Sequence, residues 1–248
     1  MAEPAPPAPQ WTPVAKVRSH ELVIAAIEDQ IMQGALKVGD PLPPERELAA
    51  RLQVSRAGVR EAIRVLEAQG VVTANVGAGP EAGTFITAMS STALTRFLRL
   101  HVALSNFAMT DIVDARVILE RNSAALAAAN AGDVEQAAIR APLLEMDSAG
   151  IDVERFNDAD TAFHVAIAQA SGNQLVSDMT VAIRASLRQP ILDAMRQVED
   201  WPALARVLQS QHHGIFAAIQ AGDAETAADL TEAHIRAAFD ALAGLRSS

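Results

Sequence analysis

The sequence predicts a mainly α-helical protein, with an N-terminal winged helix-turn-helix domain followed by an antiparallel all-α bundle of about seven helices. Apolar residues recur at helical spacing through most of the 248 residues. Two short β-type runs flank a glycine-rich segment, and proline and glycine become sparse after residue 83. Half of the residues are hydrophobic and only 4% are aromatic, a composition that favours packed helices.

The chain begins with MAEPAPPAPQWTP, which is rich in alanine and proline. This segment lacks the basic start and apolar centre of a secretory signal, so we expect a disordered tail over residues 1–13. Residues 14–88 are expected to form the first domain. Its first helix lies in SHELVIAAIEDQIMQGAL, where apolar residues recur every three or four positions and Gly34 is the expected end.

A helix-turn-helix is predicted in PERELAARLQVSRAGVREAIRVLEAQG. Pro44 suits the first turn of the short helix, and QVS forms the tight turn. Ser55 is the expected N-cap of the second helix, which turns Val59 and Ile63 inward and ends at Gly70. VVTANV and TFIT are then interpreted as two strands around the loop GAGPEAG, which together form the wing.

Residues 89–248 are predicted to be almost entirely helical. Connections of a few residues, several of them containing glycine, predict antiparallel neighbours in a bundle. The expected helices cover residues 91–107, 110–130, 133–148, 152–171, 173–197, 202–221 and 223–244.

The net charge of −10 is unevenly distributed. Residues 14–88 contain eight Lys or Arg and nine Asp or Glu, whereas residues 89–248 contain twelve and twenty. The acidity therefore lies mainly in the second domain and does not exclude a DNA-binding face on the first. The absence of cysteine excludes disulfides and thiol catalysis. No apolar run approaches the ~20 residues that cross a bilayer, so we expect a cytoplasmic protein with no membrane partner.

Positively charged residues cluster at the start of the second helix of the helix-turn-helix, the part that reaches base edges in this motif. Arg56 and Arg60 lie one turn apart, away from the apolar face, and their forked donors suit guanine or phosphate. Arg46 on the preceding helix is placed to bind a phosphate. In the alternative interpretation, the arginines pair with Glu61 and Glu67 on a solvated helix. The neighbouring short helix, the turn and the wing favour DNA binding.

The segment GDPLPPERELAARLQVSRAGVREAIRVLEAQGVV resembles the DNA-binding domain of the GntR family of bacterial transcription regulators. The family pattern is a Pro-Glu-Arg-Glu-Leu-Ala helix, then Val-Ser-Arg, then Val-Arg-Glu-Ala. The resemblance implies that Arg46, Arg56 and Arg60 contact operator DNA, with the Ser55 hydroxyl on a phosphate.

The chain departs from the family pattern at two places on this surface. Relatives often have Thr-Pro or Thr-Thr where this chain has Ala57 and Gly58, so a hydroxyl contact is missing. The wing sequence NVGAGPEAGTF has no Lys or Arg, so its minor-groove contact is expected from backbone amides, at Gly77.

Four polar residues on three predicted helices occupy inward-facing stripes: Asp160, His164, His212 and His234. An inward carboxylate is costly to desolvate unless a positive partner meets it. Three imidazoles and one carboxylate suit a divalent transition metal, here zinc or nickel. The alternative for each single residue is a core side chain that a neighbour satisfies. His213, next to His212, is expected on the solvent-exposed face of the same helix.

The region after residue 90 resembles the FCD domain, the ligand-binding domain of the FadR subfamily of GntR regulators. The matching segments are DARVILE, DADTAFHVAIAQASGN, QHHGIFAAIQAGD and AHI. The resemblance implies an FCD-like bundle of seven helices that binds an effector and forms the dimer. It also implies that the Asp and three His of these segments, here Asp160, His164, His212 and His234, bind the metal ion.

The same resemblance places an arginine, here Arg116, in or near the effector pocket. A pair with Glu120, four residues further along the helix, is the alternative role of Arg116. Arg184 and Arg188 are alternative anion partners on another helix.

Together these features predict a ligand-responsive transcription regulator, a repressor that binds double-stranded operator DNA and senses a small carboxylate at the metal-containing site. A homodimer is expected because helix-turn-helix proteins bind two half-sites related by two-fold symmetry. No general base is recognised beside the ligands, so we expect no catalytic residues. Three alternatives stay open: a metal-dependent enzyme fused to a helix-turn-helix, a fatty acyl-CoA sensor, and a regulator for which the metal itself is the signal.

Overall fold

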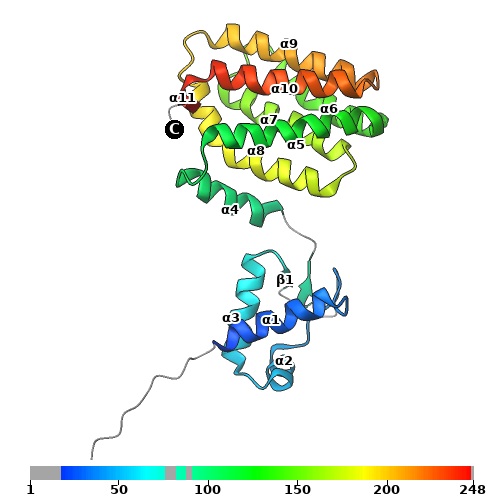
Figure 1. Ribbon diagram of the computed structural model, residues 1–248, viewed down its shortest axis with the longest axis vertical. Coiled ribbons are helices and arrows are strands. Elements are labelled where there is room, and N and C mark those ends of the chain that lie inside the picture. The colour runs from blue at the N-terminus through cyan, green and yellow to red at the C-terminus, as the bar shows by residue number, and fades with distance from the viewer. Residues whose placement is uncertain (1–17, 76–81, 88–90, 247–248) are drawn as a thin grey trace, which may run out of the picture. The chain divides into compact units, whose positions relative to one another are not determined.

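The computed structural model describes residues 18–75, 82–87 and 91–246, so the predicted tail over residues 1–13 lies outside it. The chain divides into two compact units, Met1–Met89 and Ser90–Ser248. The described residues form eleven helices and one two-stranded sheet, which confirms the mainly α-helical class (Figure 1). None of the described helices is both long and apolar enough to span a bilayer.

The smaller unit has the order of a winged helix-turn-helix. Its elements are α1 (Ser19–Met32), α2 (Glu45–Leu52), α3 (Arg56–Ala68), β1 (Val72–Asn75) and β2 (Gly83–Ile86). The strands pair antiparallel, with Val72 opposite Ile86. The turn between α2 and α3 passes through Gln53, whose φ of 53° is left-handed. This geometry confirms the predicted motif.

The core of this unit forms because α1, α2 and α3 each turn an apolar stripe inward. Its buried helical residues include Val23, Ile27, Leu48, Val59, Ile63 and Leu66. The Ser55 hydroxyl accepts a hydrogen bond from the Gly58 amide at 3.1 Å, which caps α3 as predicted. A Cβ on Gly58 would lie 2.8 Å from the Cβ of Ser19, so the missing side chain lets the start of α1 lie against the first turn of α3.

The larger unit is a bundle in which long helices run side by side (Figure 1). Its elements are α4 (Ser91–Ala103), α5 (Met109–Asn130), α6 (Asp133–Met146), α7 (Val153–Ala170), α8 (Gln174–Met195), α9 (Trp201–Gln220), α10 (Ala224–Ala241) and α11 (Ala243–Arg246). The seven predicted helices correspond to α4–α10 and most of their ends agree within one or two residues.

Two predicted helix ends are wrong. The first helix of the bundle was expected to reach residue 107 but ends at Ala103, because Ser105 takes a left-handed φ of 52°. The last was expected to reach residue 244, but α10 ends at Ala241. Leu242, with φ −97° and ψ 76°, leaves the helical region and separates the short α11.

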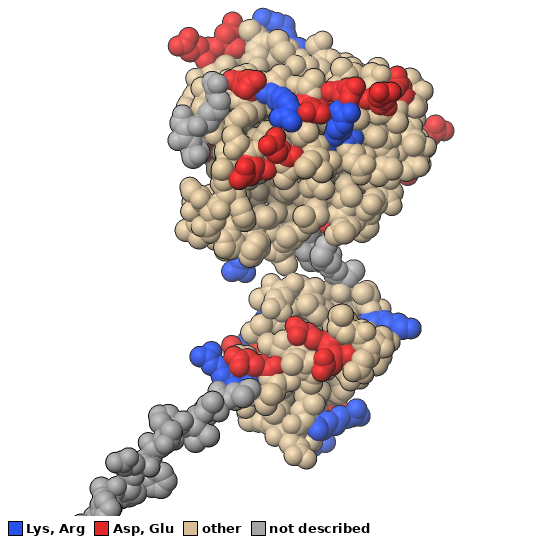
Figure 2. All heavy atoms as spheres, in the orientation of Figure 1, with Lys and Arg blue, Asp and Glu red and all other residues tan. Residues whose placement is uncertain are grey.

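Exposed ion pairs join α5 to α10, one of the helices that carry the predicted metal ligands. Arg121 pairs with Glu232 at 2.9 Å, and Arg236 pairs with Asp114 at 3.2 Å. Figure 2 shows acidic and basic side chains alternating in a band over α10. Each exposed pair contributes little to stability, so the packing of α5 and α10 rests mainly on their apolar contacts.

Among the described residues of the bundle, the buried charged and histidine side chains gather at one place. Phe156, Phe163 and Ile167 of α7 are buried at helical spacing, and Asp160 and His164 lie on the same face. Buried polar residues from neighbouring helices meet them there: Arg116, Glu120, Arg184, His212 and His234. Polar groups at this depth need partners, so the pairing within this group decides what the site can do.

Candidate metal centre and DNA-reading helix

The N-terminal end of α3 presents its polar side chains to solvent. Ser55, Arg56 and Arg60 are exposed, whereas Val59 is fully buried. The arginines therefore lie on the face opposite the core, where a major groove would meet the helix in this motif. Because its oxygen accepts from the Gly58 amide, the Ser55 hydroxyl still has its proton to donate to a phosphate.

Arg60 has a partner that the sequence did not suggest. Its Nε and Nη2 atoms donate to the two carboxylate oxygens of Glu45 on α2, at 3.3 and 3.0 Å. The hydrogen bond from Arg60 lowers the pKa of the Glu45 carboxyl. Of the two expected partners, Glu61 lies 3.7 Å from Arg64 and Glu67 accepts from the amide of Ala74. The solvated-helix alternative is therefore wrong for Arg60, whereas Glu61 does pair with another arginine of the same helix, Arg64.

Two other arginines of this surface are free for a ligand. Arg46 and Arg56 are exposed and form no salt bridge within the described part of the chain. Gly77, the residue expected to contribute the wing contact, lies outside the described residues. Of the three arginines predicted to contact DNA, Arg46 and Arg56 thus have no ion-pair partner among the described residues, and Arg60 is bound to Glu45.

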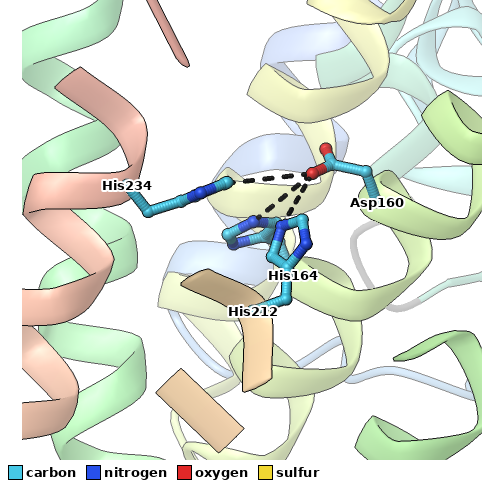
Figure 3. Close-up of side chains that lie close together, drawn as sticks. All are labelled: Asp160, His164, His212 and His234. Carbon is cyan, nitrogen blue, oxygen red and sulfur yellow. Dashed lines mark ion pairs between the residues drawn. The ribbon is translucent and has the colours of Figure 1, made fainter. Parts of the chain in front are cut away.

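In the larger unit, three helices bring the four predicted metal ligands together (Figure 3). Asp160 and His164 come from α7, His212 from α9 and His234 from α10. One potential ligand atom from each lies within 4.8 Å of all the others, and all four residues are buried. Asp160 directs one oxygen, Oδ1, at the three imidazoles; its distances to the Nε2 atoms of His212, His164 and His234 are 3.0, 3.8 and 3.9 Å.

Outer partners fix which imidazole nitrogen faces the centre. Glu120 on α5 lies 2.9 Å from Nδ1 of His164, and Gln211 on α9 places its Oε1 atom 2.9 Å from Nδ1 of His234. Both partners accept, so each ring carries its proton on Nδ1 and keeps a lone pair on Nε2. Hydrogen bonds of this kind orient the histidine ligands of metal sites.

Arg184 on α8 joins the two buried carboxylates. It donates to Oδ2 of Asp160 at 2.9 Å and, through Nε, to Oε1 of Glu120 at 2.8 Å. Burial disfavours the ionised form of Asp160, but Arg184, His212 and His164 together outweigh this effect and hold the pKa of that carboxyl well below its usual range. The same arginine lowers the pKa of Glu120, with Arg116 as a second cause. Both carboxylates are therefore ionised at neutral pH.

His164 and His234 are neutral at the same pH. Burial lowers the pKa of His164 to about 4, and the positive charge of Arg184 acts in the same direction. Burial also lowers the pKa of His234 well below its usual value, with His212 and His164 as further causes. Neutral imidazoles and an ionised carboxylate are the forms that bind metals.

The buried nitrogen atoms test whether a metal ion fits. Nε2 of His164 and both ring nitrogens of His212 have no hydrogen-bond partner within the described residues. Nε2 of His212 is close to Asp160 without the alignment of a hydrogen bond. Buried polar atoms are normally satisfied, so two unpartnered Nε2 atoms, of His164 and His212, beside one oxygen of Asp160 fit a shared cation.

Family models match both units of the chain. The model described as "Bacterial regulatory proteins, gntR family" matches residues 20–81, and the model "FCD domain" matches residues 111–237. The chain belongs to the GntR family and carries an FCD domain. It is a transcription regulator of the GntR type, as its winged helix-turn-helix and helical bundle indicate.

Curated relatives of this GntR-family chain are transcription regulators. It is 31% identical to the HTH-type transcriptional regulator LutR of Bacillus subtilis over 86% of this chain and 96% of LutR. It is 29% identical to the transcriptional repressor NanR of Klebsiella aerogenes over 90% of this chain and 85% of NanR. Identity to the Glc operon transcriptional activator of Escherichia coli is 28%, over 80% of this chain and 79% of the activator.

A solved structure supports the fold of this GntR-family chain. Streptococcus agalactiae GntR superposes with a TM-score of 0.63 at 22% identity, over 92% of this chain and all of that one. At this identity the likeness concerns the fold alone.

The three arginines that sequence reasoning assigned to the effector lie at different depths in the FCD domain. Arg116 and Arg184 are buried beside the four ligands, and Arg116 donates through Nε to Glu120 at 3.0 Å, as its alternative role predicted. Arg188 is exposed and donates to Asp158 at 2.7 Å. The structure therefore brings Arg116 and Arg184 to the metal ligands and leaves Arg188 on the surface.

A small cavity adjoins the ligands within the FCD domain. Its volume is about 30 Å³, room for roughly two waters. Arg116, Asp160, Arg184 and His234 form its polar wall, and apolar side chains from α8, α9, α10 and α11 line the rest.

The sequence did not identify the two residues that contact the Nδ1 atoms of the histidines, Glu120 and Gln211. Glu120 was considered only as a partner of Arg116, although the helical period also turns it toward the interior. Gln211 directly precedes His212, and no pattern distinguished it from a surface residue. The contact of Glu120 with His164 depends on how α5 packs against α7, which local spacing does not reveal.

Proposed function

We propose that this GntR-family protein is a homodimeric repressor that senses a small organic anion at a divalent metal ion held by Asp160, His164, His212 and His234. The convergence of four buried donor atoms within 4.8 Å, three of them imidazole nitrogens, carries the proposal. Zinc or nickel suits this set of nitrogen and oxygen donors. When bound, the ion supplies a Lewis-acidic centre for a carboxylate.

The charges of the site favour an anionic effector. Without a metal, the carboxylates of Asp160 and Glu120 balance the guanidinium groups of Arg116 and Arg184, and His164 and His234 are neutral. A divalent ion adds positive charge that none of these residues cancels. Because uncompensated buried charge is costly, the loaded site favours a negatively charged ligand.

Arg116 is the arginine that we propose to contact this ligand. Its single hydrogen bond to a described residue uses Nε, so its two terminal nitrogens stay available, and its side chain borders the cavity. Arg184 is already committed to Asp160 and Glu120. The cavity volume of about 30 Å³ argues against a fatty acyl chain, which needs a long apolar tunnel.

Operator binding is assigned to α3. We propose that Arg56 and Arg60 enter the major groove, with Arg46 and Ser55 on phosphates, and that a second subunit reads the other half-site. The effector shifts the equilibrium between operator-binding and released arrangements only by its differential affinity for them.

The test begins with elemental analysis and mass spectrometry of gently purified full-length protein. We expect one transition-metal ion per chain and a co-purified small acid. His212→Ala should abolish the stoichiometric metal, whereas His213→Ala should retain it, because His213 is exposed and pairs with Asp147 at 2.9 Å. Metal retained in His212→Ala, or absent from zinc-loaded wild-type protein, would refute the proposed site.

Operator binding then separates the rival functions. Release by the co-purified acid in the presence of metal supports the proposal. Release by a chelator alone, with no effect of the acid, would make the metal the signal. Turnover of small carboxylates or phosphoesters by wild-type protein but not by His164→Ala would identify an enzyme.

A further inference from the structure

The two carboxylate oxygens of Asp160 have different surroundings. Oδ1 faces the imidazoles of His164, His212 and His234, and Figure 3 shows it as the shared end of three ion pairs. Oδ2 points away from the histidines and accepts a hydrogen bond from Nη1 of Arg184 at 2.9 Å. Only one oxygen of this carboxylate is therefore offered to the centre of the cluster.

Arg184 is itself held firmly in this position. Its Nε and Nη2 atoms donate to the two oxygens of Glu120, and only 2% of the residue is exposed. This two-bond arrangement fixes the plane of the guanidinium, so the remaining nitrogen meets Asp160 in one orientation. Glu120 in turn contacts Nδ1 of His164 at 2.9 Å. One buried ion-pair group thus orients two of the four metal ligands.

From this arrangement we infer that Arg184 is a positioning residue that keeps Asp160 a single-oxygen ligand of the bound metal. The inference rests on the proposed metal site. A carboxylate that binds through one oxygen occupies one coordination position fewer than a chelating carboxylate. Because Arg184 binds Oδ2, that oxygen does not reach the metal, and one coordination position of the metal stays available for the oxygen of an outside ligand.

Arg184 therefore acts on ligand binding without touching the ligand. A purely structural ion pair would affect folding and metal content but would not alter how the loaded metal accepts an outside anion. Arg116, with its unused terminal nitrogens beside the cavity, remains the proposed contact of the effector itself.

The experiment uses the full-length protein loaded with cobalt(II) and titrated with azide, followed by the visible absorption of the metal. Arg184→Met is the test variant, because methionine fills space without a donor. Arg196→Met is the matched control, since Arg196 ends the same helix, is exposed and pairs with Glu154. Arg184→Lys is the second variant, which keeps the charge but has a single nitrogen.

We expect Arg184→Met to retain one cobalt per chain, to change the cobalt spectrum before azide is added, and to bind azide about tenfold more weakly. Wild type and Arg196→Met should give identical titrations. An unchanged spectrum and azide affinity in Arg184→Met would overturn the inference. If that variant does not fold, Arg184→Lys decides in the same way, with a smaller loss of azide affinity expected.

The same titration distinguishes this inference from the proposed function. Wild-type protein that takes up no cobalt would refute the metal site itself. Normal cobalt uptake with no dependence of azide affinity on residue 184 would refute only the role of Arg184.

Discussion

Each unit contains an arginine that binds a glutamate through two nitrogens, but one arginine is exposed and the other is buried. On α3, Arg60 bonds Glu45 through two nitrogens while more than half of its side chain stays exposed. In the bundle, Arg184 makes an equally forked contact with Glu120, but only 2% of the residue is exposed. Similar bonding geometry therefore occurs at the surface and at full depth.

The depth of each pair decides what can replace it. Near the surface, water and salt screen the pair, so a DNA phosphate or guanine can take the place of Glu45 at little cost. In the interior, nothing solvates an abandoned partner, so the Arg184 pairs persist unless another charge enters. The surface pair suits exchange with a nucleic acid, and the buried group suits fixed orientation of ligands.

The largest expected difference between the two regions is in stability. Arg184→Met in metal-free protein should lower the free energy of unfolding by about 3–5 kcal/mol, because Asp160 and Glu120 lose their shared buried partner. Arg196→Met, which removes an exposed and screened pair, should cost far less. Urea unfolding of both variants measures this difference. Equal losses would mean that burial does not separate the two kinds of pair.

The second prediction concerns acid sensitivity of the buried site. The pKa of His164 falls from 6.5 to about 4 on folding, so the unfolded state binds more protons between these values. The stabilisation is complete above pH 6.5 and is lost as pH falls toward 4, at a cost of about 3 kcal/mol. His234 shifts in the same direction. Urea unfolding with a chelator at several pH values checks this slope, and a flat profile between pH 6.5 and 5 would contradict it.

A third prediction concerns Arg56, an exposed arginine on α3. Arg56→Ala should weaken operator binding by about 1–3 kcal/mol and relax the preference at one base pair if Arg56 contacts a base. The fold should be unaffected, since Arg56 forms no salt bridge within the described residues. Titrations against a set of single-base operator variants measure both effects. A uniform loss across all sequences would assign Arg56 to a phosphate instead.

The smallest expected effect is at the surface pair itself. Glu45→Gln should lower the free energy of unfolding by less than about 1 kcal/mol, because the pair with Arg60 is exposed and screened. The loss should shrink further at high salt. Thermal unfolding at two salt concentrations measures it. A loss of several kcal/mol would show that Glu45 holds α2 against α3 and not merely the orientation of Arg60.

Sequence reasoning succeeded where local periodicity carries the information. The inward stripe of α7 placed Asp160 and His164 together, and the N-cap at Ser55 located the start of α3. It failed where contacts depend on packing between distant segments. Arg184 meets Asp160 and Glu120 from different helices, 24 and 64 residues away, and no spacing rule links those positions.

A similar limit applies at the surface. Arg60 and Glu45 are 15 residues apart and meet only because the left-handed Gln53 folds α2 back toward α3. The end of α10 depends on the backbone angles of Leu242, a residue type that favours helices. Both features follow from tertiary packing, which overrides local propensity.

Two consecutive residues of α9, Gln211 and His212, contact two different helices of the bundle. Gln211 reaches His234 on α10, while the next side chain, His212, points at the carboxylate of α7. Successive helical residues point about 100° apart, so one rotation of α9 about its axis would break both contacts together. The positions of α7, α9 and α10 are therefore linked through these two neighbouring side chains, because α9 cannot rotate without disturbing its contacts with both other helices.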